Sequence, residues 1–307
     1  VDKNICVDLS VLNNRIRVTF DYYFKDTDPL LVSIGMPPSA AATSLYTNMG
    51  RQISRGWTGT LNYVFLRKKD LSCSINMNAR ANHSEYRDIG DKLDYLNKVG
   101  SSTALNRYYE GGSPDDLWAV PSLGIDPETG KEVFVKKDGS LTTIWDYNDK
   151  VVCGTTDPKF RGTLNSFLTF KGISLNMSFN FQWGGQTYNQ TLASRVEGVN
   201  PNSNCDRRVL YDRWKKPGDR TFFKNIALEE NVSNLTTRFV QDYNYFQIGS
   251  ISLGYEMRRE LCRKIGLTGL RFNFNMGDIA RFSSVKEERG LSYPFARQFT
   301  FSLSASL

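Results

Sequence analysis

Hydrophobic and polar residues alternate most regularly between Phe160 and Trp183. After a predicted turn at Lys171-Gly172, every second residue is apolar and the residues between are serine, asparagine or glutamine. The apolar positions are Ile173, Leu175, Met177, Phe179, Phe181 and Trp183. Strict alternation is the period of a β-strand with one apolar and one polar face. The segment therefore predicts a hairpin whose two faces meet different surroundings.

The length of this strand indicates which surroundings its apolar face contacts. A strand of about 11 residues extends for about 36 Å, and a tilt of about 45° shortens its height to about 25 Å. That height matches the apolar band of an outer-membrane β-barrel, whose polar face lines a water-filled lumen. In a soluble sandwich the same face would instead pack on a second sheet.

Similar alternation recurs along the chain and predicts about nine strands. Residues 5–11 and 16–24 form a hairpin around Asn13-Asn14, and one strand ends near Leu66 before the turn at 67–70. Further strands are predicted over 71–82, 160–170, 173–183, 243–257, 270–276 and 299–307. The apolar parity shifts near Gly249, which predicts a β-bulge there.

The segments between these strands have other compositions. Residues 26–49 contain three prolines and the small-residue run SAAATS, so we expect a loop. A helical part is expected near 84–99, and the Glu-Thr-Gly and Lys-Asp-Gly steps within 124–146 predict a small meander. A second long insert, polar and aromatic, reaches about residue 240.

The connections between the predicted strands alternate between short and long. If the last strand ends in the periplasm, every short connection lies on the periplasmic side and every long one outside. This asymmetry is typical of an outer-membrane barrel, and a soluble β-sandwich gives no reason for it. A bacterial single-chain barrel has an even number of strands, so nine strands predict further strands upstream of Val1. Val1 is not an initiator methionine, which also indicates a piece of a longer protein.

Composition excludes several classes of protein. Forty per cent of the residues are hydrophobic, and no window approaches the ~20 consecutive apolar residues that a membrane-spanning helix needs. The net charge of +7 is spread along the chain without a long basic block, so we expect no nucleic-acid partner. Aromatic residues make up 13 per cent, which favours β-structure, interfacial girdles or sugar-stacking surfaces.

The residue types that carry catalysis or bind metals are sparse. His83 is the one histidine, and no nucleotide-binding or HExxH motif occurs. The five cysteines form no CxxC pair; Cys153 and Cys205 would pair only in an oxidising compartment. The acidic pairs Asp26/Asp28 and Asp115-Asp116 are compatible with calcium or sugar chemistry but more typical of solvated loops. The sequence therefore predicts no enzyme, no metal site and no cofactor.

The long outer loops hold the better binding candidates, because a ligand has to pass them. Their side chains combine flat apolar faces with hydrogen-bond donors, which suits sugars or peptides, although the same aromatics could pack the loops together or onto a partner. The candidates for substrate binding or lid contact are Tyr108, Tyr109, Trp118, Trp145, Tyr188, Arg207, Arg208, Tyr211 and Trp214.

Several loop and strand segments together resemble one family. GIDPETGKEVF, DPKFRGTLNSFLTFKGISLNMSFNFQWGGQTYNQTL, DRRVLYDRWKKPGD, TRFVQDYNYFQIGSISLGYEM and RGLSYPFARQFTFSLSASL cover most of residues 118–307. In this order they resemble the C-terminal part of SusC/RagA-like TonB-dependent outer-membrane transporters. DRRVLYDRW recurs in that family, which favours a structural or lid-docking role for it over substrate choice.

The resemblance implies the fold class and the partners. It implies an all-β, antiparallel transmembrane barrel of 22 strands, of which residues 1–307 would supply about the last nine. It also implies uptake of oligosaccharides or peptides across the outer membrane of a Gram-negative bacterium, with a SusD-like lipoprotein as lid and energy from a TonB complex. The plug and the segment that contacts TonB are absent from this chain, and Leu307 stands where the family usually ends in an aromatic. The alternatives are a soluble β-sandwich that binds carbohydrate and a passive porin or adhesin.

Overall fold

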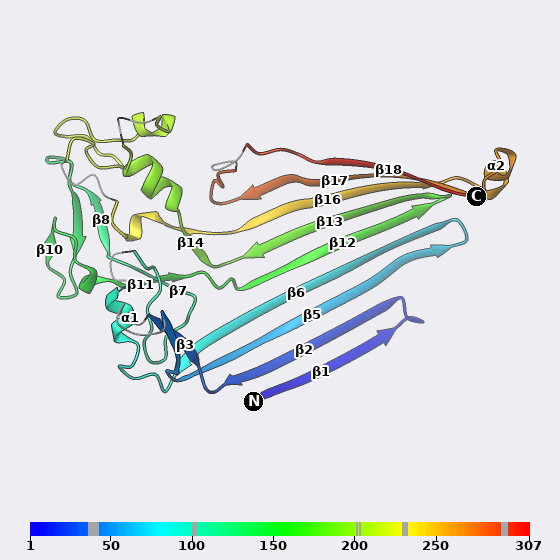
Figure 1. Cartoon of the computed structure of the whole chain (residues 1–307). Coiled ribbons are helices and arrows are strands. Elements are labelled where there is room, and N and C mark those ends of the chain that lie inside the picture. Colours follow the sequence, from blue (N-terminus) through cyan, green and yellow to red (C-terminus); the bar gives the residue numbers. More distant parts are fainter. Residues whose placement is uncertain (36–42, 100–102, 201, 203, 229–232, 290–293) are drawn as a thin grey trace.

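The computed structural model contains one large antiparallel sheet whose nine strands follow the chain order (Figure 1). The structure describes all residues except 36–42, 100–102, 201, 203, 229–232 and 290–293. The strands of the large sheet are β1 (Asp2–Val11), β2 (Ile16–Thr27), β5 (Arg51–Lys68), β6 (Leu71–Arg87), β12 (Phe160–Phe170), β13 (Ile173–Trp183), β16 (Tyr245–Glu256), β17 (Gly269–Ser283) and β18 (Phe299–Ser306). This arrangement confirms the predicted strand count and the antiparallel fold class.

Strand register divides the sheet into an apolar and a polar face, because directly paired residues point to the same side. One row of paired residues across seven strands is Leu9, Val18, Leu61, Met77, Leu164, Phe179 and Ile248. The next row, on the other face, is Asp8, Thr19, Thr60, Asn78, Thr163, Asn180 and Gln247. Phe167 is an apolar residue on the polar face, where it pairs with Asn176. The alternation predicted for single strands thus continues across the sheet.

The polar face satisfies part of its own hydrogen-bonding capacity. Asn76 donates to the Oδ1 of Asn62 at 2.6 Å, and Asn78 donates to the Oγ1 of Thr60 at 3.3 Å. On the apolar face, large side chains remain exposed, such as Ile173, Leu253 and Phe301. A face with these properties is stable beside lipid, while its opposite is stable in water.

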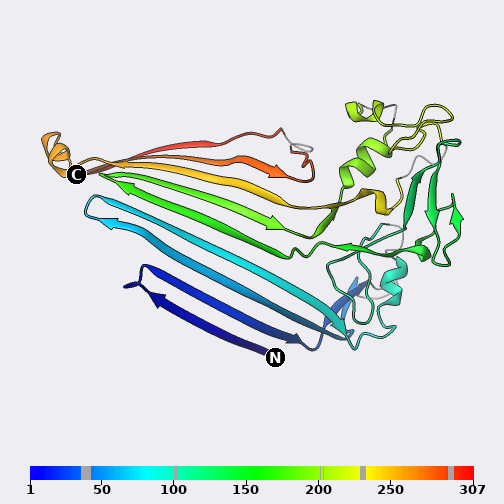
Figure 2. The same cartoon turned by 180° about the vertical axis from the view of Figure 1, so that it is seen from behind.

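Long and short connections lie at opposite ends of the strands (Figures 1 and 2). Connections 12–15, 69–70, 171–172 and 257–268 are at the end that carries the C-terminus and the helix α2 (Arg259–Lys264). The smaller sheets gather at the other end, and in the described part of the chain no second sheet covers a face of the large one. This sorting confirms the connection asymmetry and contradicts the sandwich alternative.

No helix among the described residues is long and apolar enough to cross a membrane.

The long connections contain their own elements. Their strands are β3 (Leu31–Gly35), β4 (Ser44–Asn48), β7 (Asp116–Ala119), β8 (Ser122–Ile125), β9 (Glu132–Val135), β10 (Leu141–Thr142), β11 (Val151–Thr155), β14 (Gln186–Tyr188) and β15 (Val240–Asp242). Their helical turns are α1 (Asp94–Val99), η1 (Tyr147–Asp149), η2 (Leu192–Glu197), η3 (Arg207–Leu210) and η4 (Thr237–Phe239). The meander expected over 124–146 is confirmed, because β8, β9 and β10 form one sheet.

Two predictions about these connections were wrong. The loop expected over 26–49 contains the β3–β4 hairpin, because Leu31 and Val32 pair with Asn48 and Thr47. Most of the SAAATS run lies outside the described residues. The helix expected near 84–99 is reduced to the six residues of α1, because β6 continues to Arg87 by pairing with β5. Tertiary pairing thus overrides local composition at both places.

The predicted turn and bulge are both present. Lys171 and Gly172 have φ of 46° and 87°, and a Cβ at Gly172 would lie 2.6 Å from the Glu256 carbonyl oxygen. Glycine is therefore required for the tight return between β12 and β13. Gly249 is the extra residue where the β13–β16 register shifts between Ser178 and Phe179. Because of this bulge, the apolar residues of β16 before and after Gly249 point to the same face of the sheet.

Candidate functional site

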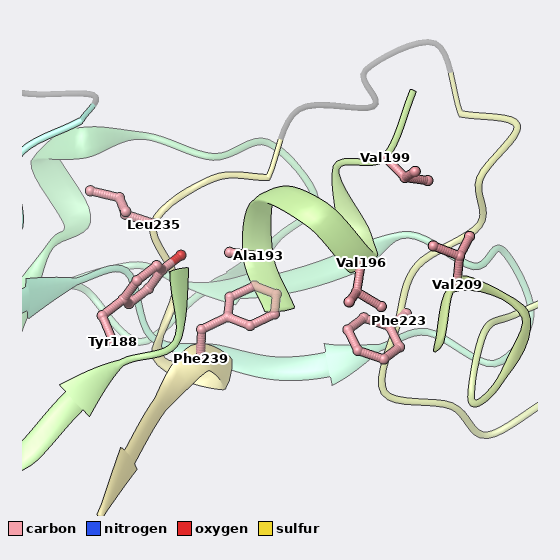
Figure 3. Close-up of a cluster of buried hydrophobic side chains, with 8 residues drawn as sticks. All are labelled: Tyr188, Ala193, Val196, Val199, Val209, Phe223, Leu235 and Phe239. Atoms are coloured by element: carbon pink, nitrogen blue, oxygen red, sulfur yellow. The ribbon is translucent and has the colours of Figure 1, made fainter. Parts of the chain in front are cut away.

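The long connections 88–159 and 184–244, together called the outer loop layer, pack around a hydrophobic cluster of their own (Figure 3). Its buried members are Tyr188, Ala193, Val196, Val199, Val209, Phe223, Leu235 and Phe239. The rings of Tyr188 and Phe239 meet edge to face at 5.8 Å. The side chains of the cluster come from β14, η2, η3 and η4 and from the loops between them. Their packing therefore fixes how these segments lie at the end of the sheet. The strands of the large sheet therefore end, on this side, in a layer of packed loops.

A buried ion network lies beside this cluster. The Arg238 guanidinium donates to both carboxylate oxygens of Glu132, at 2.6 and 2.7 Å, and to Glu197 at 2.8 Å. It also lies over the rings of Phe222 and Phe239, at 5.4 and 4.9 Å. All three charged side chains are at most 6 per cent exposed. One buried guanidinium thus pairs with two buried carboxylates.

Glu197 is the less well satisfied of these carboxylates. Its Oε2 is buried without a hydrogen-bond partner. Burial raises the pKa of Glu197, and the attraction of Arg238 opposes this shift only in part. Neither acid was among the candidates from the sequence, because nothing local marks a residue whose partner lies 106 positions away, as for Glu132, or 41, as for Glu197.

Within the layer, the DRRVLYDRW segment packs on the meander. Trp214 donates its indole N–H to the Pro127 carbonyl at 2.8 Å, and Arg213 donates to the carbonyls of Val209 and Lys224. A Cβ at Gly130, whose φ is +70°, would lie 2.6 Å from the Trp214 ring. The glycine of the Glu-Thr-Gly turn therefore serves the close approach of this tryptophan as well as the turn itself.

Six of the nine candidate residues contribute to packing or hydrogen bonding inside the layer. Tyr188 and Trp214 are buried. Tyr108 packs on Tyr86 at 5.5 Å. Tyr109 donates to Asp116 at 2.8 Å and meets the Trp118 ring edge to face at 5.0 Å. Burial raises the pKa of Tyr109 to about 12, and its bond to Asp116 adds to the shift.

Trp145 is the sixth, and it borders a cavity. Its indole N–H donates to the Leu235 carbonyl at 3.2 Å. The cavity measures about 480 Å³ and is also lined by Phe134, Ile144, Lys131 and Asn234. Its size and its mixture of aromatic, cationic and amide groups fall within the usual range for small-ligand pockets.

Arg207, Arg208 and Tyr211 lie at the edge of the layer. Arg207 donates to the Tyr211 hydroxyl at 3.1 Å, and its guanidinium lies 5.8 Å from the centre of that ring. Tyr211 is 53 per cent exposed, and its neighbour Leu210 is 67 per cent exposed. Arg208 forms ion pairs with Asp206 at 2.6 Å and Glu288 at 2.7 Å and lowers the pKa of Asp206 to about 2.

Other chemical groups have ordinary roles. Asp26 forms an ion pair with Arg51, and Asp116 accepts from Tyr109 and from the Ser113 N–H. The Cys153 thiol is free and donates to the Leu117 carbonyl, so it forms no disulfide with Cys205. Within the described ranges, no three His, Cys, Asp or Glu side chains are placed to hold a metal ion.

Known proteins similar in sequence are TonB-dependent receptors. No protein-family model matches the chain. TonB-dependent receptor P3 of Formosa agariphila is 24 per cent identical over 300 residues, which cover 90 per cent of this chain and 29 per cent of that receptor. TonB-dependent receptor SusC of Bacteroides thetaiotaomicron is 21 per cent identical over 267 residues, covering 83 per cent of this chain and 26 per cent of SusC. The chain thus spans less than a third of the length of these receptors.

Solved structures with a similar fold include the RagAB peptide importer in two states. The "open-open" state matches with a TM-score of 0.77 and 18 per cent identity, covering all of this chain and 34 per cent of the matched chain. The "closed-closed" state matches with a TM-score of 0.78 and 19 per cent identity, covering 99 and 35 per cent. At this identity the likeness shows the fold alone.

Sequence and fold lead to the same group of proteins. The homologues are receptors of the bacterial outer membrane, where they form β-barrels, and they are not enzymes. The nine-stranded sheet, with its apolar outer face, therefore lies in the outer membrane. The resemblance inferred from the sequence is confirmed: the chain is a SusC/RagA-like relative of the TonB-dependent receptors.

Proposed function

We propose that residues 1–307 are the C-terminal barrel portion of an outer-membrane importer for oligosaccharides or peptides. A plug and further strands would belong to the same polypeptide, energy would come from a TonB complex, and a SusD-like lipoprotein would close the outer mouth. The observation that carries this proposal is the sheet itself. One face is mainly apolar along the nine strands, the other is mainly polar, and a packed loop layer lies at one end only.

The importer is tested by uptake in the native bacterium. The full-length gene is deleted, and uptake of fluorescent oligosaccharide and peptide pools is compared with that of the parent strain. We expect the deletion to abolish uptake of one pool, and we expect the same loss in a strain without TonB. Unchanged uptake of both pools after deletion would contradict the proposal.

A passive porin is the second candidate, because the polar face is that of a water-filled lumen. It predicts uptake that depends on the gene but not on TonB. The same pair of strains therefore separates the two functions.

The exposed corner of the DRRVLYDRW segment is the part of the layer that we assign to the lipoprotein. Arg207 and Tyr211 are held together by a hydrogen bond and ring contact, and Leu210 beside them is exposed. Tyrosine and arginine are the residue types that anchor protein interfaces, and a pre-ordered pair loses little entropy on binding. Arg208, also at the edge, is engaged in ion pairs with Asp206 and Glu288, and the other six candidates pack within the layer and would shape the mouth.

We therefore expect Tyr211→Ala to weaken binding of the lipoprotein by about thirtyfold or more, since interface anchors contribute about 2 kcal/mol or more each. Co-purification from native membranes and titration of the purified partners measure this. Tyr95→Ala is the matched control, because Tyr95 is a similarly exposed tyrosine (60 per cent) on α1. Equal affinity for both variants would contradict the assignment.

A further inference from the structure

Two arginines face each other on the polar surface of the sheet. Arg80 on β6 and Arg161 on β12 are directly paired in the strand register, in a row that also contains Asp21, Thr58 and Gln182. Like charges in directly opposed positions repel each other. Both side chains are exposed, and neither forms an ion pair with a described residue. The wall thus carries a repulsive pair that Asp157, the carboxylate nearest to it in the same cavity, offsets only in part.

These arginines line a cavity of about 290 Å³ at the outer part of the polar face. The other lining residues are Tyr23, Lys25, Ser54, Ala81, Asn82, Asp157 and Pro158. Three cations and one carboxylate, Asp157, leave a net charge of +2 there. The Tyr23 hydroxyl already donates to Asn82 at 2.7 Å, so the remaining donors in the cavity are mainly the cationic groups.

We propose that Arg80 and Arg161 form a binding site for a carboxylate group of the transported ligand. Paired guanidinium groups offer planar, forked donors that match a carboxylate, and one anion between them removes their repulsion. The cavity opens on the polar face, which in a barrel is the lumen that a ligand crosses. This inference rests on the proposed import function and narrows its substrate to acidic molecules, either a peptide carboxylate or an acidic sugar.

A comparison with Arg17 shows why this pair is unusual. Arg17 is also on the polar face, but it forms a bidentate ion pair with Asp8. Among the described residues the wall thus supplies an ion-pair partner for Arg17 but none for Arg80 or Arg161. Arg17→Ala consequently removes one positive charge from the same face without touching the proposed site, which makes it a matched control.

The test measures binding of four defined probes to the full-length protein by calorimetry in detergent. Triglutamate is paired with triglutamine, and trigalacturonate with maltotriose, so each acidic probe has a neutral counterpart and the two pairs separate the two sources of carboxylate. We expect one acidic probe to bind more tightly than its counterpart. Arg80→Ala and Arg161→Ala should each weaken that binding about ten- to hundredfold, while Arg17→Ala leaves it unchanged.

Three results would overturn the site: no preference for either acidic probe, equal loss in Arg17→Ala, or unchanged affinity in both arginine variants. A lower Tm of ligand-free Arg161→Ala with unchanged probe affinity would assign the pair to a carboxylate of the protein itself and overturn it as well. Failure here is distinguishable from failure of the importer, because the uptake experiment uses whole oligosaccharide and peptide pools and detects TonB-dependent import whatever the charge of the molecule taken up.

Discussion

The sheet and the outer loop layer of this protein are stabilised in different ways. In the sheet, side chains have little protein on either side, and mid-strand residues such as Met177 and Asn180 are only half-buried. In the loop layer, Phe239, Val196 and Glu197 are fully buried around a compact cluster. The sheet depends on its surroundings, lipid on one face and water on the other, whereas the layer carries its own core. Substitutions should therefore have different consequences in the two regions.

The largest expected effect is in the layer. Arg238→Met leaves Glu132 and Glu197 buried without their cation, and loss of one partner from a buried ion network costs about 3–5 kcal/mol. Hydrogen exchange of the full-length protein in detergent should show this loss of protection at Val196 and Phe239 but not at Phe179 in the sheet. Equal loss of protection in the layer and in the sheet would contradict the conclusion that the two regions are stabilised separately.

Two controls accompany this variant. Arg207→Met removes an exposed arginine from the same layer, so its effect should stay within about 0.5 kcal/mol. Combining Arg238→Met with Glu132→Gln and Glu197→Gln removes the stranded charges, and we expect most of the lost protection to return. If protection stays low, packing of the arginine on Phe222 and Phe239 is the larger contribution.

The next effect concerns the two faces of the sheet. Met177 and Asn176 are neighbours at the middle of β13 and point to opposite faces. Arg at Met177 would face lipid near the bilayer midplane and should cost about 2–4 kcal/mol, while Arg at Asn176 faces water and should cost about 0.5 kcal/mol. Urea titration of the full-length protein refolded into lipid vesicles measures both. Similar costs at the two positions would contradict the assignment of the faces.

The same contrast explains what the sequence predicts well. Strands such as β12 and β13 were located from alternation alone, because a face in lipid and a face in water impose their preferences residue by residue. The layer was predicted poorly, since Arg238 meets Glu132, which lies 106 positions earlier in the chain, only once the segment between them has folded. Tyr188 and Trp214 became site candidates for the same reason that they are buried: a large ring with one donor suits both a ligand and a core.

The smallest expected effect depends on pH. Burial raises the folded-state pKa of Glu197 above its ordinary value of 4.5, so the ionised carboxylate costs stability. That cost is absent below the unfolded-state pKa, grows as the pH rises above it, and is complete above the folded-state pKa. Glu197→Gln removes the charge and should become more stable relative to the wild type as the pH rises above 4.5. Hydrogen exchange at Val196, corrected for intrinsic rates, measures the difference.

Glu110 in the same layer is the control with the opposite sign. Burial alone would raise the pKa of its carboxyl, but hydrogen bonds from the Ile89 and Asp88 N–H groups outweigh this and lower it. Folding therefore favours the ionised carboxylate of Glu110. The stability that this carboxylate contributes is lost as the pH falls through its lowered pKa. Glu110→Gln should accordingly lose stability relative to the wild type as the pH rises, in contrast to Glu197→Gln. If both variants change in the same direction, a general effect of charge on the layer explains them better than their separate surroundings do.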